Sequence, residues 1–142
     1  GGGFVHRYLL FSKDAPVVKA VAANPAFVTI PDKNILYPFG LKGVANSDKN
    51  IKSWVNKDMA ILLGEDDLGS RTKPLSNGQM ARDQGPNCLT RGKLLYSKTK
   101  TKAEESGFDF NWELITVPGV GHDNYKLAPF ASIYLFGDEE EK

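Results

Sequence analysis

The chain has a single cysteine, no long apolar run and almost no net charge. Cys88 cannot form a disulfide within the chain, so the sequence gives no disulfide evidence for an oxidising compartment, and we expect a buried bystander thiol. No apolar run approaches the roughly 18 residues of a membrane span, so we expect no such span. The formal net charge is +1 with scattered lysines, which predicts no nucleic-acid partner.

The length of 142 residues suits one domain and is too short for two comfortable ones. A hydrophobic fraction of 41% and a charged fraction of 25% are those of an ordinary soluble globular protein. The chain lacks a basic-then-apolar leader and begins with three glycines instead of methionine. We therefore expect a processed product, an engineered start or a fragment.

Three segments are rich in strand-forming residues. They are Val17–Ala23, Met59–Leu63 and Trp112–Val117. The second is a nearly continuous apolar run, which is typical of a strand buried on both faces of a parallel sheet.

Three further segments place apolar residues at helical spacing: Phe4–Phe11, Thr90–Ser106 (with Thr90 able to cap its start) and Lys126–Phe136. The weakly patterned stretches 27–57 and 68–90 are expected to be irregular excursions, with one helical turn around Asp48–Val55 in the first. The alternation of helices and strands predicts an α/β fold with right-handed parallel crossovers.

Acidic residues and a histidine follow two of the expected strands. Glu65, Asp66 and Asp67 come directly after the second strand, and His122 follows the third in a Pro- and Gly-containing turn. Carboxyl ends of parallel strands meet at one edge of a sheet, where ligands bind in open α/β folds. Each feature also has an ordinary interpretation, a solvated acidic turn or a loop histidine bonded to a backbone carbonyl. Together they provide two parts of an acyl-transfer relay, which then needs only a nucleophile.

The opening Gly1-Gly2-Gly3 runs straight into the first expected helix. It can be a phosphate-cradling loop, a sharp strand-to-helix turn or a flexible cloning remnant. No Lys-Ser/Thr pair follows it, which disfavours the phosphate loop. The sequence indicates no cofactor and no metal ligand.

The turns resemble those of a known family. Gly64-Glu65-Asp66-Asp67 is similar to the G-x-x-D acid turn of α/β-hydrolase-fold proteins, particularly esterase- or lipase-like members. Val117-Pro118-Gly119-Val120-Gly121-His122 resembles their closing histidine turn, and Gly1-Gly2-Gly3-Phe4-Val5-His6-Arg7 looks like the tail of their G-x-S-x-G nucleophile elbow. The similarity covers essentially all 142 residues and implies the carboxyl-terminal half of one such domain. The chain would then hold the last three parallel strands and flanking helices of an incomplete sheet.

This resemblance implies that Asp67 and His122 are catalytic and that the nucleophile is absent from this chain. Matching Gly1 to the last glycine of the elbow puts the nucleophile two residues upstream, and five strands of the fold would be absent as well. None of the eight serines has a G-x-S-x-G context, so none is carried over as nucleophile: Ser12, Ser47, Ser53, Ser70, Ser76, Ser97, Ser106 and Ser132.

The function implied is that of a serine hydrolase acting on a small-molecule ester or similar acyl substrate through a Ser-His-Asp relay. Asp67 would orient the imidazole of His122, and the missing amino-terminal half of the same fold would be the structural partner. Two alternatives stay open: a non-catalytic relic or interaction module, and a dehalogenase or epoxide hydrolase with an upstream Asp nucleophile. The resemblance also implies that this chain alone is inactive.

Overall fold

The structure is a computed structural model that describes residues 1–12, 14–69 and 78–140. Ser70 and Ser76 lie outside the described residues, as do all of residues 70–77 of the expected excursion 68–90.

Within the described part of the chain, three strands form one parallel sheet in the order β1-β2-β3. The strands are β1 (Lys19–Ala23), β2 (Asp58–Gly64) and β3 (Trp112–Val117). The predicted parallel α/β sheet is therefore confirmed. Strand β2 is buried from Met59 to Gly64, as its continuous apolar run predicts for a central strand.

Strand β1 starts two residues later than expected. Lys19 pairs with Asp58, the first residue of β2, so Val17 and Val18 extend beyond the end of the partner strand. Val18 is 85% exposed. A β-branched residue favours a strand only where a neighbouring strand supplies hydrogen bonds and packing, and at Val18 no strand of the described structure does so.

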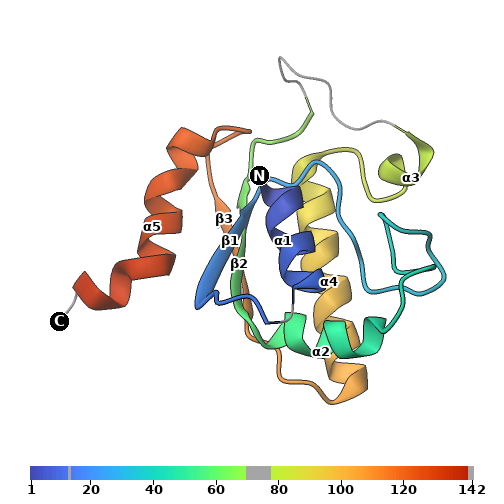
Figure 1. Cartoon of the computed structure of the whole chain (residues 1–142). Helices are drawn as coiled ribbons and strands as arrows, with labels where there is room; N and C mark the ends of the chain where they lie inside the picture. The colour runs from blue at the N-terminus through green and yellow to red at the C-terminus, as the bar shows by residue number, and fades with distance from the viewer. Residues whose placement is uncertain (13, 70–77, 141–142) are drawn as a thin grey trace.

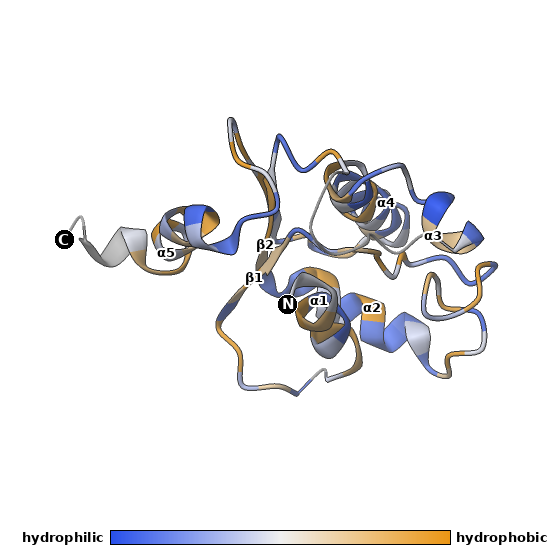
Figure 2. Ribbon diagram, turned by 90° about the horizontal axis from the view of Figure 1, so that it is seen from above, coloured by the Kyte–Doolittle hydropathy of each residue, from blue (hydrophilic) through white to orange (hydrophobic). Residues whose placement is uncertain are grey.

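Helices cover both faces of the sheet, as Figures 1 and 2 show. Helices α1 (Gly2–Phe11), α2 (Ser47–Asn56) and α4 (Cys88–Ser106) lie on one face, and α5 (Asn124–Glu140) packs against β1 and β2 from the other. The short α3 (Gln79–Arg82) lies away from the sheet (Figure 1). This arrangement leaves the carboxyl ends of the strands free to carry a site.

The helices differ from the sequence prediction in their bounds. Helix α1 begins at Gly2 instead of Phe4, α5 spans Asn124–Glu140 instead of Lys126–Phe136, and α3 lies within the stretch 68–90. Helix α2 is ten residues long, where a single turn was expected, because Ile51, Trp54 and Val55 bury one face in the core. Helix α4 begins at Cys88, because Asn87 is its N-cap and accepts a hydrogen bond from the Thr90 backbone N–H at 2.8 Å.

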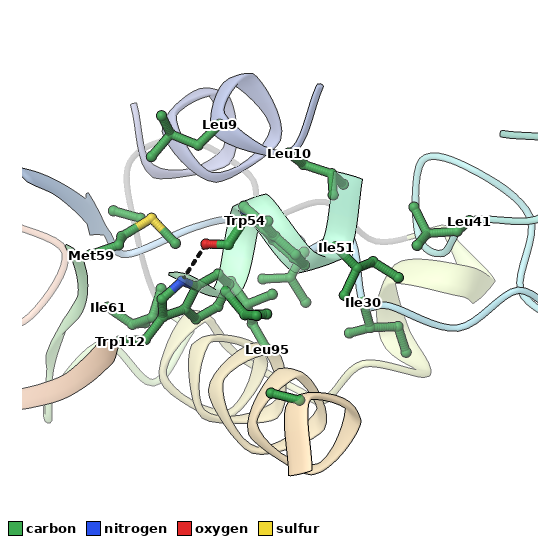
Figure 3. Packing of buried hydrophobic residues seen from close by; sticks show 14 of the residues in the cluster. Leu9, Leu10, Ile30, Leu41, Ile51, Trp54, Met59, Ile61, Leu95 and Trp112 are labelled. Atoms are coloured by element: carbon green, nitrogen blue, oxygen red, sulfur yellow. Dashed lines mark hydrogen bonds between the residues drawn. The ribbon is translucent and has the colours of Figure 1, made fainter. Parts of the chain in front are cut away.

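A pair of tryptophans joins α2 to β3 in the core. Trp112 donates its indole N–H to the carbonyl oxygen of Trp54 at 3.0 Å (Figure 3), and the two rings meet edge to face with centroids 4.7 Å apart. Trp54 in turn donates to the carbonyl oxygen of His6 in α1 at 2.9 Å. Helices α1 and α2 and strand β3 are thereby fixed to one another.

The buried His6 side chain lies at the α1 end of this connection. Its Nδ1 lies 2.8 Å from the carbonyl oxygen of Gly2, and its Nε2 accepts the backbone N–H of Thr29 at 3.0 Å. The neutral ring satisfies both contacts, whereas protonation of Nε2 would break the second. Burial, opposed by the Gly2 carbonyl and assisted by the charge of Arg7, lowers the pKa of His6 from 6.5 to about 4.

We predict that the free energy of unfolding falls as the pH falls from 6.5 towards 4. In this range the unfolded chain binds a proton at His6 and the folded chain does not. The contribution of neutral His6 to the free energy of unfolding is therefore fully present above pH 6.5 and is lost as the pH falls towards 4. The full effect is roughly 3 kcal/mol, at about 1.36 kcal/mol per pKa unit. Urea denaturation at several pH values measures it.

The matched variant is His6→Gln, which keeps a donor and an acceptor but does not titrate. Its stability should depend less on pH over this range than that of the parent, and the difference between the two isolates His6 from the carboxylates. In the parent, NMR signals of the His6 ring should not titrate between pH 7 and 5. A His6 ring that titrates near pH 6.5 would contradict the prediction.

Candidate functional site

The turns that follow β2 and β3 lie against each other at the carboxyl edge of the sheet. Gly64 pairs with Val117 at the ends of the two strands. Beyond them, the backbone N–H of Glu65 donates to the Val117 carbonyl oxygen at 2.9 Å, and that of Asp66 donates to the Val120 carbonyl oxygen at 2.8 Å. The pairing of the strands therefore continues into the turns.

This contact brings Asp67 and His122 together. The Nδ1 atom of His122 lies 2.8 Å from Oδ2 of Asp67. The Asp67 side chain is 1% exposed and the His122 side chain 30% exposed. A carboxylate only accepts hydrogen bonds, so Nδ1 carries the proton in this contact. In the neutral ring of this tautomer, the lone pair is on Nε2.

The structure separates the three acidic residues of the first turn. Asp67 contacts the imidazole and is buried, Asp66 is exposed and Glu65 is half-buried. The geometry thus pairs His122 with the acid that the resemblance implies. That these two residues are catalytic stays a prediction.

Glycine permits the close approach of the two turns. A Cβ atom at Gly64 would collide with the carbonyl oxygens of Val120 and Gly121. Gly119 has a φ of 73°, in the left-handed region that glycine adopts without strain. The sequence pattern of glycines at both strand ends therefore reflects a backbone-to-backbone contact.

Asn24 supports the site and was not singled out from the sequence. It is 3% exposed, and its Oδ1 accepts the backbone N–H of Gly64 at 3.1 Å. Its Nδ2 donates to the carbonyl oxygen of Gly121 at 3.4 Å. The sequence feature that could have pointed to Asn24 is the Asn-Pro pair at the end of a predicted strand. An amide side chain there can both donate and accept, so it can bond backbone groups of both neighbouring turns.

Cys88 also lies at the site. Its thiol is buried, as predicted for a bystander cysteine. However, its Sγ lies within 4.8 Å of the nearest ligand atoms of Asp67 and His122. The backbone N–H of Leu89 donates to the carbonyl oxygen of Asp67 at 3.4 Å, which holds the start of α4 against the acid turn. No motif spacing reveals this cluster, because its members come from separate elements.

A cavity of about 540 Å³ adjoins His122. Its walls include the start of α1, the ends of β1 and β2 and part of α5. Gly2 is helical, and a Cβ atom there would collide with the Ala23 carbonyl oxygen, so the opening glycines pack into the fold.

Among the described residues that line the cavity, none carries a hydroxyl or a thiol. The N-terminus of α1 carries unpaired N–H groups and a partial positive charge.

Across the part of the chain that the structure describes, no helix is long and apolar enough to cross a membrane.

Comparisons with known proteins matched solved structures alone. No protein-family model matches the chain, and neither does any curated protein. Poly(aspartic acid) hydrolase-1 from Sphingomonas sp. KT-1 is 36% identical with a TM-score of 0.86, over 92% of this chain and 50% of that one. LpqC, a poly(3-hydroxybutyrate) depolymerase from Bordetella parapertussis, is 33% identical with a TM-score of 0.87, over 96% of this chain and 46% of that one.

The present chain thus spans about half the length of the structures that it matches. Both neighbours are hydrolases with an α/β-hydrolase fold and are esterase-like. The parallel order β1-β2-β3, with helices on both faces, is the corresponding part of that sheet. The chain therefore has an α/β-hydrolase fold, and the solved structures that it resembles are esterase-like hydrolases of that fold.

Proposed function

We propose that the whole protein is a serine hydrolase that cleaves an ester or similar acyl bond. One observation carries the proposal: a buried carboxylate 2.8 Å from the Nδ1 of a partly exposed imidazole. A poly(3-hydroxybutyrate) depolymerase and a poly(aspartic acid) hydrolase among the structural neighbours support hydrolysis of acyl bonds. The substrate proposed is a small-molecule ester or acyl compound.

In this mechanism His122 acts first as general base and then as general acid. Asp67 holds the Nδ1–H, so Nε2 accepts the proton of the nucleophile as it attacks the carbonyl carbon. The imidazolium that forms is stabilised by the buried Asp67 carboxylate. Nε2 then gives the proton to the leaving group, and a water molecule repeats the cycle on the acyl-enzyme.

The nucleophile is proposed to be a serine in a G-x-S-x-G turn upstream of Gly1. Two observations support this: the neighbours are about twice as long as the chain, and none of the described residues lining the His122 cavity carries a hydroxyl. The start of α1 also lines that cavity, where backbone N–H groups suit an oxyanion. An upstream Asp would instead indicate dehalogenase or epoxide hydrolase chemistry, and no nucleophile would indicate a relic.

The remaining half of the same fold is the proposed structural partner, with residues 1–142 forming the carboxyl-terminal part of one domain. Strand β1 pairs on one side with β2, and no described strand pairs with its other side. On α1, Phe4, Tyr8 and Phe11 are 68%, 42% and 42% exposed and form a stripe at helical spacing. Such a stripe beside an open sheet edge is the surface that further chain of a larger domain would cover.

In the intact enzyme, Asp67→Asn should lower kcat on the order of 10⁴-fold, because an amide favours the wrong imidazole tautomer. The matched control is Asp66→Asn, which removes an exposed carboxylate from the same turn. It should change kcat by less than about threefold, since an exposed substitution rarely shifts free energies by more than about 0.5 kcal/mol. Steady-state hydrolysis of a chromogenic ester measures both. A larger loss in Asp66→Asn would make Asp66 the functional acid.

The 142-residue chain alone should neither hydrolyse a short-chain chromogenic ester nor react with a serine-directed phosphonate. A base and an orienting acid have nothing to activate without a nucleophile. Co-expression with an upstream half should restore hydrolysis. Turnover by the purified chain that disappears in His122→Ala would show that the nucleophile lies within these residues.

A further inference from the structure

Three potential metal ligands converge beside the proposed relay. A carboxylate oxygen of Asp67, Sγ of Cys88 and a ring nitrogen of His122 all lie within 4.8 Å of one another. They come from the turn after β2, the first residue of α4 and the turn after β3. We propose that this cluster binds Zn²⁺ and that the bound ion switches off the relay. The second part rests on the proposed function, whereas the first does not.

The donor set fits Zn²⁺ better than a hard cation. Thiolate, imidazole and carboxylate are the groups that bind zinc, and an open site uses three of them with a water molecule as the fourth ligand. Ca²⁺ and Mg²⁺ prefer sites built from oxygen alone. The Asp67 carboxylate and the Cys88 thiolate would together balance the charge of the ion. The 30% exposure of the His122 side chain gives the ion access and room for the water ligand.

Small movements bring the three atoms to zinc geometry. Bonds of about 2.0–2.3 Å place neighbouring atoms of a tetrahedron roughly 3.3–3.8 Å apart. The 2.8 Å contact between Asp67 and His122 must therefore open by about 0.5 Å, and contacts as long as 4.8 Å must close by about 1 Å. His122 can supply this movement, because its side chain is 30% exposed and Gly119 and Gly121 precede it in the turn.

Zinc at this position would reverse the proton arrangement of the relay. In the metal-free relay, the Nδ1 proton faces Asp67 and Nε2 is the base. A zinc ion needs the Nδ1 lone pair, so the ring proton must move to Nε2, which can then no longer accept the proton of the nucleophile. The Asp67 carboxylate binds the ion instead of the imidazole. The Cys88 thiol gives its proton to solvent as its sulfur binds, so about one proton is released for each zinc bound.

The binding test uses the full 142-residue chain, with its fold checked by circular dichroism and with Co²⁺ as a spectroscopic substitute for Zn²⁺. Because Cys88 is the one cysteine of the sequence, a thiolate-to-cobalt charge-transfer band can arise from this residue alone. We expect that band in the parent, together with d–d absorption of four-coordinate cobalt and complete displacement by Zn²⁺. Calorimetry in buffers of different ionisation enthalpy should report the released proton.

Variants identify the ligands. Cys88→Ser should abolish the charge-transfer band, and His122→Ala should weaken Zn²⁺ binding by more than about 100-fold, because loss of an outer partner alone costs roughly 10–100-fold. Asp66→Asn, the neighbouring exposed acid, should bind as the parent does. His122 is on the surface, so its variant gives a result even if Cys88→Ser does not fold. A folded parent without the band, or undiminished binding in His122→Ala, would overturn the site.

The inhibition test uses the intact enzyme, in which the 142-residue chain is present together with its upstream half. Zn²⁺ should inhibit it, a chelator should reverse the effect, and Cys88→Ser should need more than about 100-fold more zinc for half-inhibition relative to its own zinc-free rate. Zinc binding without inhibition would overturn the switch and leave the site intact. If the intact enzyme hydrolysed no ester even without zinc, the proposed function would be overturned. The cobalt spectra of the 142-residue chain would still show whether the metal site exists.

Discussion

The backbone contact between the turn after β2 and the turn after β3 is the constraint on which the site depends. Two hydrogen bonds, from Glu65 to Val117 and from Asp66 to Val120, extend the strand pairing past the end of the sheet. A Cβ atom at Gly64 would prevent this approach. Because the two turns meet at their backbones, a side chain as short as Asp67 can reach the imidazole of His122.

This arrangement also explains how a buried carboxylate is tolerated. Moving a charged carboxylate out of water is costly unless hydrogen-bond donors compensate for the loss. Asp67 is 1% exposed at its side chain and faces the imidazole N–H. The side chain of His122 is itself 30% exposed. In the proposed relay, Asp67 is the buried orienting acid and His122 the partly exposed base.

The core holds the platform beneath these turns. The hydrogen-bonded series from Trp112 to Trp54 to His6 ties β3 to α2 and α1, and Asn24 joins the end of β1 to both turns. The same rigidity brings the thiol of Cys88 beside the pair, because α4 starts against the acid turn. The Asp67–His122 pair, for which we propose a role in proton transfer, thereby has the donor set of a metal site beside it.

The fold class and the strands followed from local pattern. The apolar run at Met59–Leu63 is readable in the sequence because a strand covered on both faces must be apolar throughout, and Trp112–Val117 has the predicted bounds. Boundaries were wrong where a distant partner decides them. Val18 has strand propensity but extends beyond the end of β2. The start of α4 at Cys88 was missed for a local reason, because the N-cap Asn87 accepts the hydrogen bond of the Thr90 N–H.

The sequence by itself determined that an acid turn and a histidine turn follow neighbouring parallel strands, because residue type, period and glycine placement are local properties. Local pattern left Glu65, Asp66 and Asp67 open and the resemblance pointed to Asp67, and the tertiary structure places the Asp67 carboxylate against His122. It alone also brought Asn24 and Cys88 to the same edge. Their approach depends on how β1 and α4 pack against β2, and packing between distant segments leaves no periodic signal in the chain.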